Sequence, residues 1–192
     1  VGSEMCIRDS CGGSYGHSST CISLTTGATE WSSHQLPSSV GWGLSSMVLG
    51  DRIFYIGGYS SSTSYSATYT TLPLSSSPTL TPVPNLSYKG RYQCVVKLSP
   101  TTFVITGGYK SGQLSTVTLY NTEKQSETPL SSLSSPRYVH SCISLQQGGK
   151  MWLIVTGGWD GSNILATTQR LDITANTWED LGDMNYIIVW AN

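Results

Sequence analysis

The fold is decided by a stretch that ends in two glycines, Leu153-Ile154-Val155-Thr156-Gly157-Gly158-Trp159. Similar stretches occupy residues 53–59 and 103–109, and a shorter copy is Cys11-Gly12-Gly13. The second glycines of the four pairs fall at positions 13, 58, 108 and 158, so the copies are 45, 50 and 50 residues apart. This regular spacing indicates a repeat protein, whose unit has to be defined before any other feature.

Each repeat predicts four short strands. The run before the glycine pair is rich in β-branched and aromatic residues, and the pair ends the strand where the backbone needs positive φ or close approach. One apolar run precedes this strand and two follow it, so one twisted antiparallel sheet per repeat, a propeller blade, is predicted. The flanking runs are 44–49, 94–98 and 142–145 before it, 66–71, 116–120 and 168–173 after it, and 80–86, 127–133 and 178–184 last.

The last repeat resembles the kelch repeat. It contains Pro136-Arg137-Tyr138-Val139-His140, then the glycine-pair strand, then Leu171-Asp172 and finally Asn176-Thr177-Trp178. The resemblance covers residues 11–185, although the second repeat lacks the Arg-x-x-His phrase and the late Trp, and the third lacks the His and the Trp. It implies an all-β fold, a partial kelch-type β-propeller of about three and a half four-stranded blades.

The repeats divide the chain into six parts. Residues 1–10 resemble a translated sequencing adaptor and are treated as a non-native segment outside the fold. Residues 11–37 are expected to be the second half of a blade without its two inner strands, and residues 185–192 a tail of uncertain origin. Whole blades are predicted at 38–87, 88–135 and 136–184. Because closed propellers need at least four blades, the native ring is expected to need further, missing blades.

Charge gives little indication of a partner. The 192 residues carry 10 Lys and Arg against 11 Asp and Glu, and nine of each remain once residues 1–10 are set aside. The basic residues are scattered singly, which argues against nucleic acid and against a charged membrane surface. A run of about 18 apolar residues, as a membrane span needs, is absent from the sequence.

The cysteines favour core packing over bridges. Cys94 and Cys142 fall in the innermost-strand runs, where a cysteine usually acts as a small buried hydrophobe. Cys-x-x-Cys pairs are absent, and neither a metal site nor a cofactor is predicted. The compartment is left open, with the cytoplasm slightly favoured. Asn85-Leu86-Ser87 is a glycosylation sequon that matters only in a secreted protein.

The sequence predicts no catalytic residue. His140 is interpreted as a buried hydrogen-bonding group at a blade junction, and Gly-x-Ser-x-Gly is absent. The glycine pairs are not followed by Gly-Lys-Ser or Gly-Lys-Thr, so they are structural rather than phosphate-binding. Trp31 and Trp178 occupy equivalent late positions and are expected to fill the wedge between neighbouring blades.

The kelch resemblance also implies where a partner binds. In that family, the loop before the innermost strand and the loop after the glycine pair lie on one face, where partners commonly dock. Arg and aromatic side chains are the usual anchors of interfaces. The alternative that the two arginines only brace the loops is left open. The residues expected on this face are Arg91 and Arg137 from the first loop type, and Tyr59, Tyr109, Trp159 and Asp160 from the second.

The resemblance therefore implies a non-enzymatic protein-protein interaction module, with an unidentified protein partner on the loop face. Family members include ubiquitin-ligase substrate adaptors, actin-associated proteins and secreted proteins. The alternative is the propeller domain of a metal-dependent enzyme such as a copper oxidase-like protein. That alternative requires several His, Tyr or carboxylate ligands at one place, and this sequence shows no such set.

Overall fold

The computed structural model describes residues 8–11, 20–24, 29–30, 32–35, 42–50, 52–59, 69–71 and 81–185. Within these ranges the chain forms strands, turns and loops without a helix, so the predicted all-β class is confirmed. A helix long and apolar enough to cross a membrane is accordingly not found in this part. Some features singled out in the sequence lie outside these ranges: Gly12-Gly13, Trp31 and residues 186–192.

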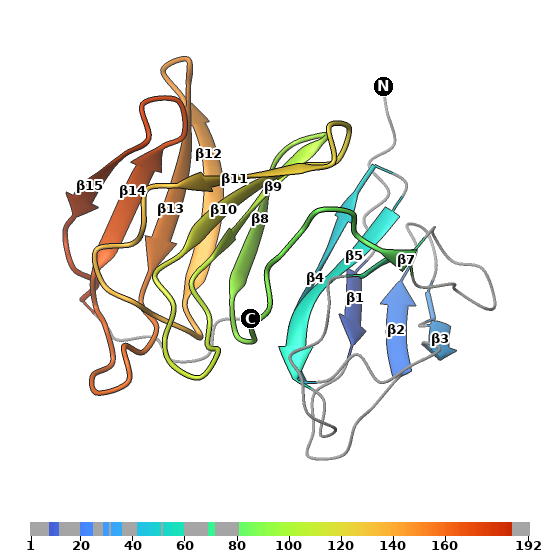
Figure 1. The fold of residues 1–192 in the computed structure, drawn as a ribbon. Coiled ribbons are helices and arrows are strands. Elements are labelled where there is room, and N and C mark those ends of the chain that lie inside the picture. The colour runs from blue at the N-terminus through green and yellow to red at the C-terminus, as the bar shows by residue number, and fades with distance from the viewer. Residues whose placement is uncertain are drawn as a thin grey trace.

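The strands form four separate antiparallel sheets (Figure 1), each a simple meander in which successive strands pair. This is the architecture of a partial β-propeller, with one four-stranded sheet, hereafter a blade, for each complete repeat. The second blade contains β4 (Trp42–Leu49), β5 (Arg52–Tyr59), β6 (Tyr69–Thr71) and β7 (Thr81–Pro82). The third contains β8 (Cys94–Ser99), β9 (Thr102–Thr106), β10 (Val117–Asn121) and β11 (Ser126–Leu130). The fourth contains β12 (Ser141–Gln147), β13 (Lys150–Thr156), β14 (Thr168–Asp172) and β15 (Thr177–Leu181).

The first sheet corrects one expectation. It has three strands, β1 (Arg8–Cys11), β2 (Thr20–Leu24) and β3 (Ser32–Gln35), and β1 pairs with β2 from Arg8↔Leu24 to Cys11↔Cys21. One of the two inner strands expected to be missing is therefore present. Three residues set aside as non-native belong to it. A strand ladder is made by backbone groups, so an extended segment can join it whatever its side chains.

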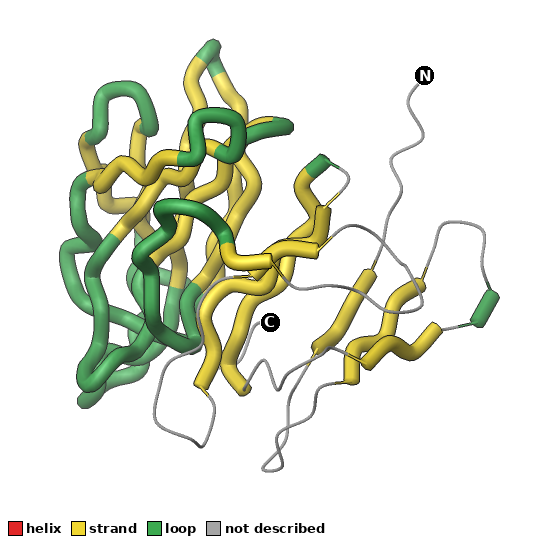
Figure 2. Tube along the Cα trace, turned by 45° about the vertical axis from the view of Figure 1, so that its right-hand side comes forward, coloured by secondary structure: helices red, strands yellow, loops and turns green. Residues whose placement is uncertain are grey.

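The blades stack in chain order (Figures 1 and 2). Apolar clusters fill the junction of the second and third blades and that of the third and fourth. Between the second and third blades, Phe54 and Ile56 of β5 pack with Phe103 of β9 and Tyr120 of β10; the Phe54 and Phe103 rings lie 5.4 Å apart. Between the third and fourth, Val104 and Val117 pack with Leu153, Val155 and Leu171. Each blade is thus stabilised by its neighbours, as in other repeat proteins.

Trp178 lies where the sequence predicted it, in the wedge between the third and fourth blades. Its ring packs against the second of these clusters, and its indole Nε1 donates to the carbonyl of Ser131 at 2.8 Å. The apolar part of the ring is thereby buried while its polar group is satisfied.

The far face of the fourth blade is different, because among the described residues no sheet covers it. Ile143 and Leu145 of β12 point away from the third blade and are 57% and 41% exposed. Such an uncovered apolar pair is what an open arc of blades leaves at its end.

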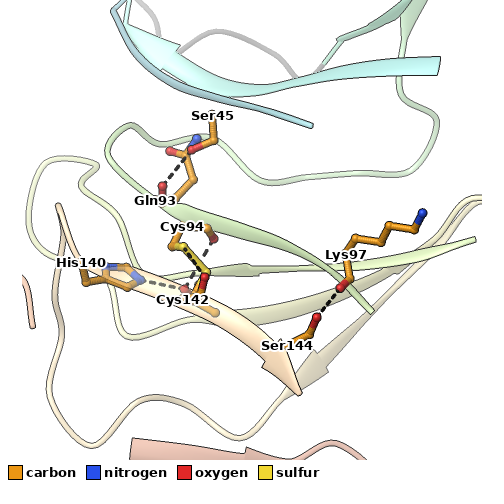
Figure 3. The surroundings of a disulfide bond; sticks show 8 residues. Ser45, Gln93, Cys94, Lys97, His140, Cys142 and Ser144 are labelled. Carbon is orange, nitrogen blue, oxygen red and sulfur yellow. Dashed lines mark hydrogen bonds between the residues drawn. A yellow bond between two sulfur atoms is a disulfide. The ribbon is translucent and has the colours of Figure 1, made fainter. Parts of the chain in front are cut away.

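A disulfide bond joins Cys94 of β8 to Cys142 of β12, with the Cα atoms 5.9 Å apart (Figure 3). The expectation that both cysteines are core fillers is therefore wrong. The two positions are out of register by one residue, since Cys94 pairs with Thr106 whereas Ser141, not Cys142, pairs with the equivalent Thr156. Because side chains alternate across a strand, residues of opposite parity on adjacent blades point toward each other. The offset can be counted in the sequence, but the direction in which each cysteine points follows only from the strand register.

Candidate functional site

Two kinds of loop meet at one end of the blades, as the kelch resemblance implied. Arg91, before β8, exchanges two backbone hydrogen bonds with Tyr109, which follows the glycine pair of the same blade, at 3.1 and 2.8 Å. Tyr138 and Trp159 do the same in the fourth blade, at 3.1 and 2.9 Å. We call this end the loop face and define it by residues 59, 91–92, 109–113, 138 and 159–164.

The glycine pairs allow these loops to approach so closely. Gly107 and Gly108 have φ of 55° and 104°, conformations that other residues rarely adopt. The N–H of Gly108 donates to the Arg137 carbonyl of the next blade at 2.9 Å, and Gly58 bonds to Gly90 in the same way at 2.7 Å. A Cβ on Gly107 would meet the Arg137 carbonyl oxygen. The predicted requirement for glycine is thus confirmed, and its cause is the junction between blades.

A line of stacked side chains runs across the loop face from the second blade to the fourth. The Arg91 guanidinium lies over the Tyr59 ring at 4.9 Å from its centroid and over the Tyr109 ring at 5.1 Å. The Tyr109 ring meets the Tyr138 ring edge-on at 5.5 Å, and Tyr138 stacks on Trp159 at 6.3 Å. We call these five residues, Tyr59, Arg91, Tyr109, Tyr138 and Trp159, the aromatic ladder.

The aromatic ladder ends in exposed apolar surface. Trp159 is 39% exposed, and Ile164, which bridges to its backbone, is 43% exposed. Tyr92 also stacks on Tyr138, with the ring centroids 6.0 Å apart. Stacking fixes the rings before any partner arrives, which lowers the entropy cost of binding. The structure therefore brings four of the expected residues together, and adds Tyr138, Tyr92 and Ile164.

Arg137 does not belong to this surface, which corrects its assignment to partner binding. Its side chain has no exposed area. The guanidinium donates to the Gly157 carbonyl at 3.0 Å and to the Thr167 hydroxyl at 3.0 Å, and it reaches the Ser135 hydroxyl at 3.1 Å. It therefore braces the loop that follows its own glycine pair, which is the alternative left open by the sequence. A buried guanidinium is tolerated because both of its terminal nitrogens are hydrogen-bonded in this way.

The two arginines are not equivalent in the repeat. Gly58 bonds to Gly90 as Gly108 bonds to Arg137, so Arg137 corresponds to Gly90, and Arg91 corresponds to Tyr138. Backbone bonds support this alignment, because Val139 N–H donates to the Tyr92 carbonyl as Tyr92 N–H donates to the Gly43 carbonyl. All three of the residues linked in this way have positive φ. The spacing in the sequence was the signal for this difference. Gln93 follows Arg91 by two positions, whereas His140 follows Arg137 by three.

Tyr88 replaces Arg137 in the third blade. Its hydroxyl donates to the carbonyl of Gly107 at 2.9 Å, just as Arg137 bonds to the carbonyl of Gly157. Burial raises the pKa of the Tyr88 hydroxyl far above its ordinary value, so it remains a donor. The sequence pattern did not single out this residue, and only the register shows its role.

Asp160 shapes the loop beside Trp159. Its Oδ1 accepts hydrogen bonds from the backbone N–H groups of Ser162 and Asn163, at 2.8 and 2.7 Å. The Asn163 and Ser162 bonds hold the pKa of the Asp160 carboxyl below its usual value. The Asp160 carboxylate therefore stabilises the turn that presents Trp159. Asp160 is half-buried and lies at the loop face.

His140 is buried at the junction of the third and fourth blades, as predicted. Only 1% of its surface is exposed, and its Nε2 lies 2.7 Å from the Thr106 hydroxyl. Burial, and secondarily the Arg137 charge, lowers the pKa of the imidazole from its usual 6.5 to about 3. The ring is consequently neutral at physiological pH.

A cleft of about 470 Å³ lies at the opposite end of the blades. Gly50, Phe54, Pro84, Tyr120 and Gln125 are among the residues that line it. The candidate residues of the loop face do not contribute to it. Across the described ranges, His, Cys, Asp and Glu side chains nowhere gather in threes around a possible metal position.

The family model of the kelch motif matches residues 153–185. These residues extend from the glycine-pair strand β13 to the end of the fourth blade. The chain carries a kelch repeat. A search of the curated proteins finds no match. The four-stranded sheets and this kelch motif together are consistent with a partial kelch-type β-propeller, and the general role of kelch repeats is to bind proteins.

Proposed function

We propose that this kelch-type module binds a protein partner on its loop face, with the aromatic ladder as the anchor. The observation that carries the proposal is the continuous stack from Tyr59 to Trp159, which crosses three blades and ends in a half-exposed indole. Large, rigid rings with a polar group beside them supply much contact area at little cost in conformational entropy.

Arg91 adds charge to this surface. Its guanidinium lies between the Tyr59 and Tyr109 rings, 4.9 and 5.1 Å from their centroids. A cation held against aromatic faces has a fixed direction, and such an arginine recognises planar acidic groups well. The partner is therefore expected to present an apolar side chain toward Trp159 and a carboxylate toward Arg91.

The disulfide bond weighs against the narrower role of ubiquitin-ligase substrate adaptor. Such adaptors work in reducing compartments, where disulfide bonds rarely persist. The bond between Cys94 and Cys142 instead favours an oxidising compartment, such as a secreted protein passes through. The copper oxidase-like alternative gains support from no residue of the described ranges.

A photo-crosslinking residue at position 159 tests the site and does not require that the partner be identified first. It should capture a defined partner, whereas the same residue at the exposed position 123, in the turn between β10 and β11, should not. Trp159→Ala is then expected to weaken the captured partner by about 1 to 2 kcal/mol, or about 5- to 30-fold. Calorimetry measures this loss, and an unchanged melting temperature confirms that the variant folds.

Glu123→Ala is the control, since it alters an exposed side chain at the far end of the blades. Full affinity in Trp159→Ala together with weakened binding in Glu123→Ala would place the partner elsewhere on the propeller.

A further inference from the structure

We propose that Asn85 is the attachment site of an N-linked oligosaccharide, in a protein that matures in an oxidising compartment. Asn85-Leu86-Ser87 is the single Asn-x-Ser or Asn-x-Thr sequence in the chain, and its middle residue is not proline. One observation indicates the oxidising compartment, and separate observations show that this segment is accessible.

The compartment is indicated by the bond between Cys94 and Cys142. It joins the innermost strands of two adjacent blades, at a sequence separation of 48 residues. Bonds of this structural kind form in the secretory pathway and outside the cell, where N-glycosylation also takes place. The compartment that favours this disulfide bond is therefore also the one in which the sequon would be glycosylated.

The segment presents the acceptor outward. Asn85 and Ser87 are exposed, whereas Leu86 between them packs against the apolar cluster of the second and third blades. The Tyr120 hydroxyl donates to the Pro84 carbonyl at 2.6 Å and holds the segment from the other side. Asn85 has φ of 53°, a left-handed turn conformation that asparagine tolerates better than most residues. The acceptor thereby lies at the tip of a surface turn, where a bulky group has room.

The chemistry of the amide fits a glycan in the folded protein. Transfer from a lipid-linked oligosaccharide pyrophosphate forms a bond between Asn85 Nδ2 and the sugar C1, breaks the bond from C1 to the pyrophosphate oxygen, and removes one amide proton. The lipid pyrophosphate is the leaving group. One N–H remains on Nδ2, and Nδ2 donates to the Gln125 carbonyl at 2.9 Å in the fold. This hydrogen bond can therefore persist beside the glycan.

The position also leaves the loop face clear. Gln125 belongs to the turn between β10 and β11, at the end of the blade where Thr122 N–H donates to the Thr101 carbonyl at 2.9 Å. The aromatic ladder lies at the other end, beyond the glycine pairs. A glycan on Asn85 would cover the rim of the cleft lined by Pro84 and Gln125. It would leave Trp159 accessible.

The test is to send the chain, behind a cleavable secretory leader, into the secretory pathway of a eukaryotic cell. The unaltered chain should migrate as a larger species that peptide N-glycosidase reduces in size, and digestion in heavy-oxygen water should label position 85. Asn85→Gln and Ser87→Ala should each lose the larger species completely. Transfer precedes folding, so the result does not depend on whether a variant folds.

Ser87→Thr is the matched control, because it keeps the sequon and the hydroxyl that donates to Glu127 Oε1; it should be glycosylated like the unaltered chain. Asn163→Gln, an asparagine outside any sequon, should also leave the larger species intact. Peptide mapping under non-reducing conditions should recover Cys94 joined to Cys142. An unmodified Asn85 in a chain that has entered the lumen would overturn the proposal, and so would free thiols at both cysteines.

Discussion

The third and fourth blades have the same backbone arrangement, but different side chains make the equivalent contacts in each. The carbonyl of the first glycine is bonded by Tyr88 in the third blade and by Arg137 in the fourth. The buried polar residue at the start of the innermost strand is Gln93 in one and His140 in the other. What the repeat preserves is therefore the set of backbone contacts at each junction, while the side chain that makes a contact is replaceable.

The largest difference between the two junctions is the disulfide bond. Cys94 and Cys142 close a loop of 48 residues between the third and fourth blades, and chain-entropy arguments give about 4 kcal/mol of stabilisation for a loop of this size. Replacing both cysteines by alanine should lower the unfolding free energy by about that amount. Urea denaturation of the oxidised protein and the double variant measures it.

The junction of the second and third blades offers the converse experiment. Ser45 and Val95 stand at the positions equivalent to Cys94 and Cys142, since they pair with Ile56 and Ile105. Ser45→Cys combined with Val95→Cys should form a second bond spontaneously under oxidising conditions. Two free thiols in that variant would show that the two junctions differ in geometry, contrary to the alignment of the repeats.

The glycine pair was predictable from the sequence, but the size of its effect comes from the junction. Gly108→Ala should cost about 3 kcal/mol, because it combines a strained positive φ with a Cβ that meets the Tyr88 hydroxyl. Gly148→Ala is the control, with φ of 61° and open space around the added Cβ, and should cost about 1 kcal/mol. Thermal melts compare them; equal losses would mean that backbone strain alone requires glycine at position 108.

The general architecture followed from the sequence because apolar runs and glycine pairs recur at a fixed period. Two of the details that failed, the arginines and the cysteines, depend on register. Arg91 and Arg137 look alike in the sequence, yet a single-residue offset leaves Arg91 half-buried at the loop face and buries Arg137 completely. An offset of one residue in the opposite direction turns Cys94 and Cys142 toward each other. A strand pattern predicts which residues alternate, but the pairing partner fixes the face on which each one lies.

The stability of the two junctions should depend differently on pH, because one contains the titratable His140 where the other contains Gln93. The pKa of His140 is about 3 in the fold against 6.5 when the chain is unfolded, so the unfolded state binds the extra proton first. Stability should therefore be lost as the pH falls below about 6.5, at up to about 1.4 kcal/mol per pH unit until the folded ring titrates near 3.

His140→Gln gives the fourth blade the residue that the third blade already has, in Gln93. This variant should lose most of the His140 contribution to the slope between pH 6 and pH 4, even if it is less stable at pH 7. Chemical denaturation at a series of pH values measures both curves. A slope in His140→Gln equal to that of the unaltered protein would assign the acid sensitivity to other groups.

The smallest expected effect concerns Tyr88, which takes the place of Arg137 in the third blade. Tyr88→Phe removes only the hydroxyl that donates to the Gly107 carbonyl, and should cost about 1 kcal/mol, the usual loss for one hydrogen bond. Arg137→Met should cost more, because the guanidinium bonds to Gly157, Thr167 and Ser135 together.

Tyr88 also has a second role that a double variant isolates. Its hydroxyl oxygen is the atom nearest to a Cβ on Gly108, so Tyr88→Phe should relieve part of the clash that Gly108→Ala creates. The double variant should then lose less than the sum of the two single losses, by about 1 kcal/mol, because residues in contact are not additive. Additive losses in thermal melts would mean that the clash is absorbed by the Arg91 carbonyl or the Gln93 side chain, the next atoms around the added group. The tyrosine would in that case act only through its hydrogen bond, as the arginine does in the following blade.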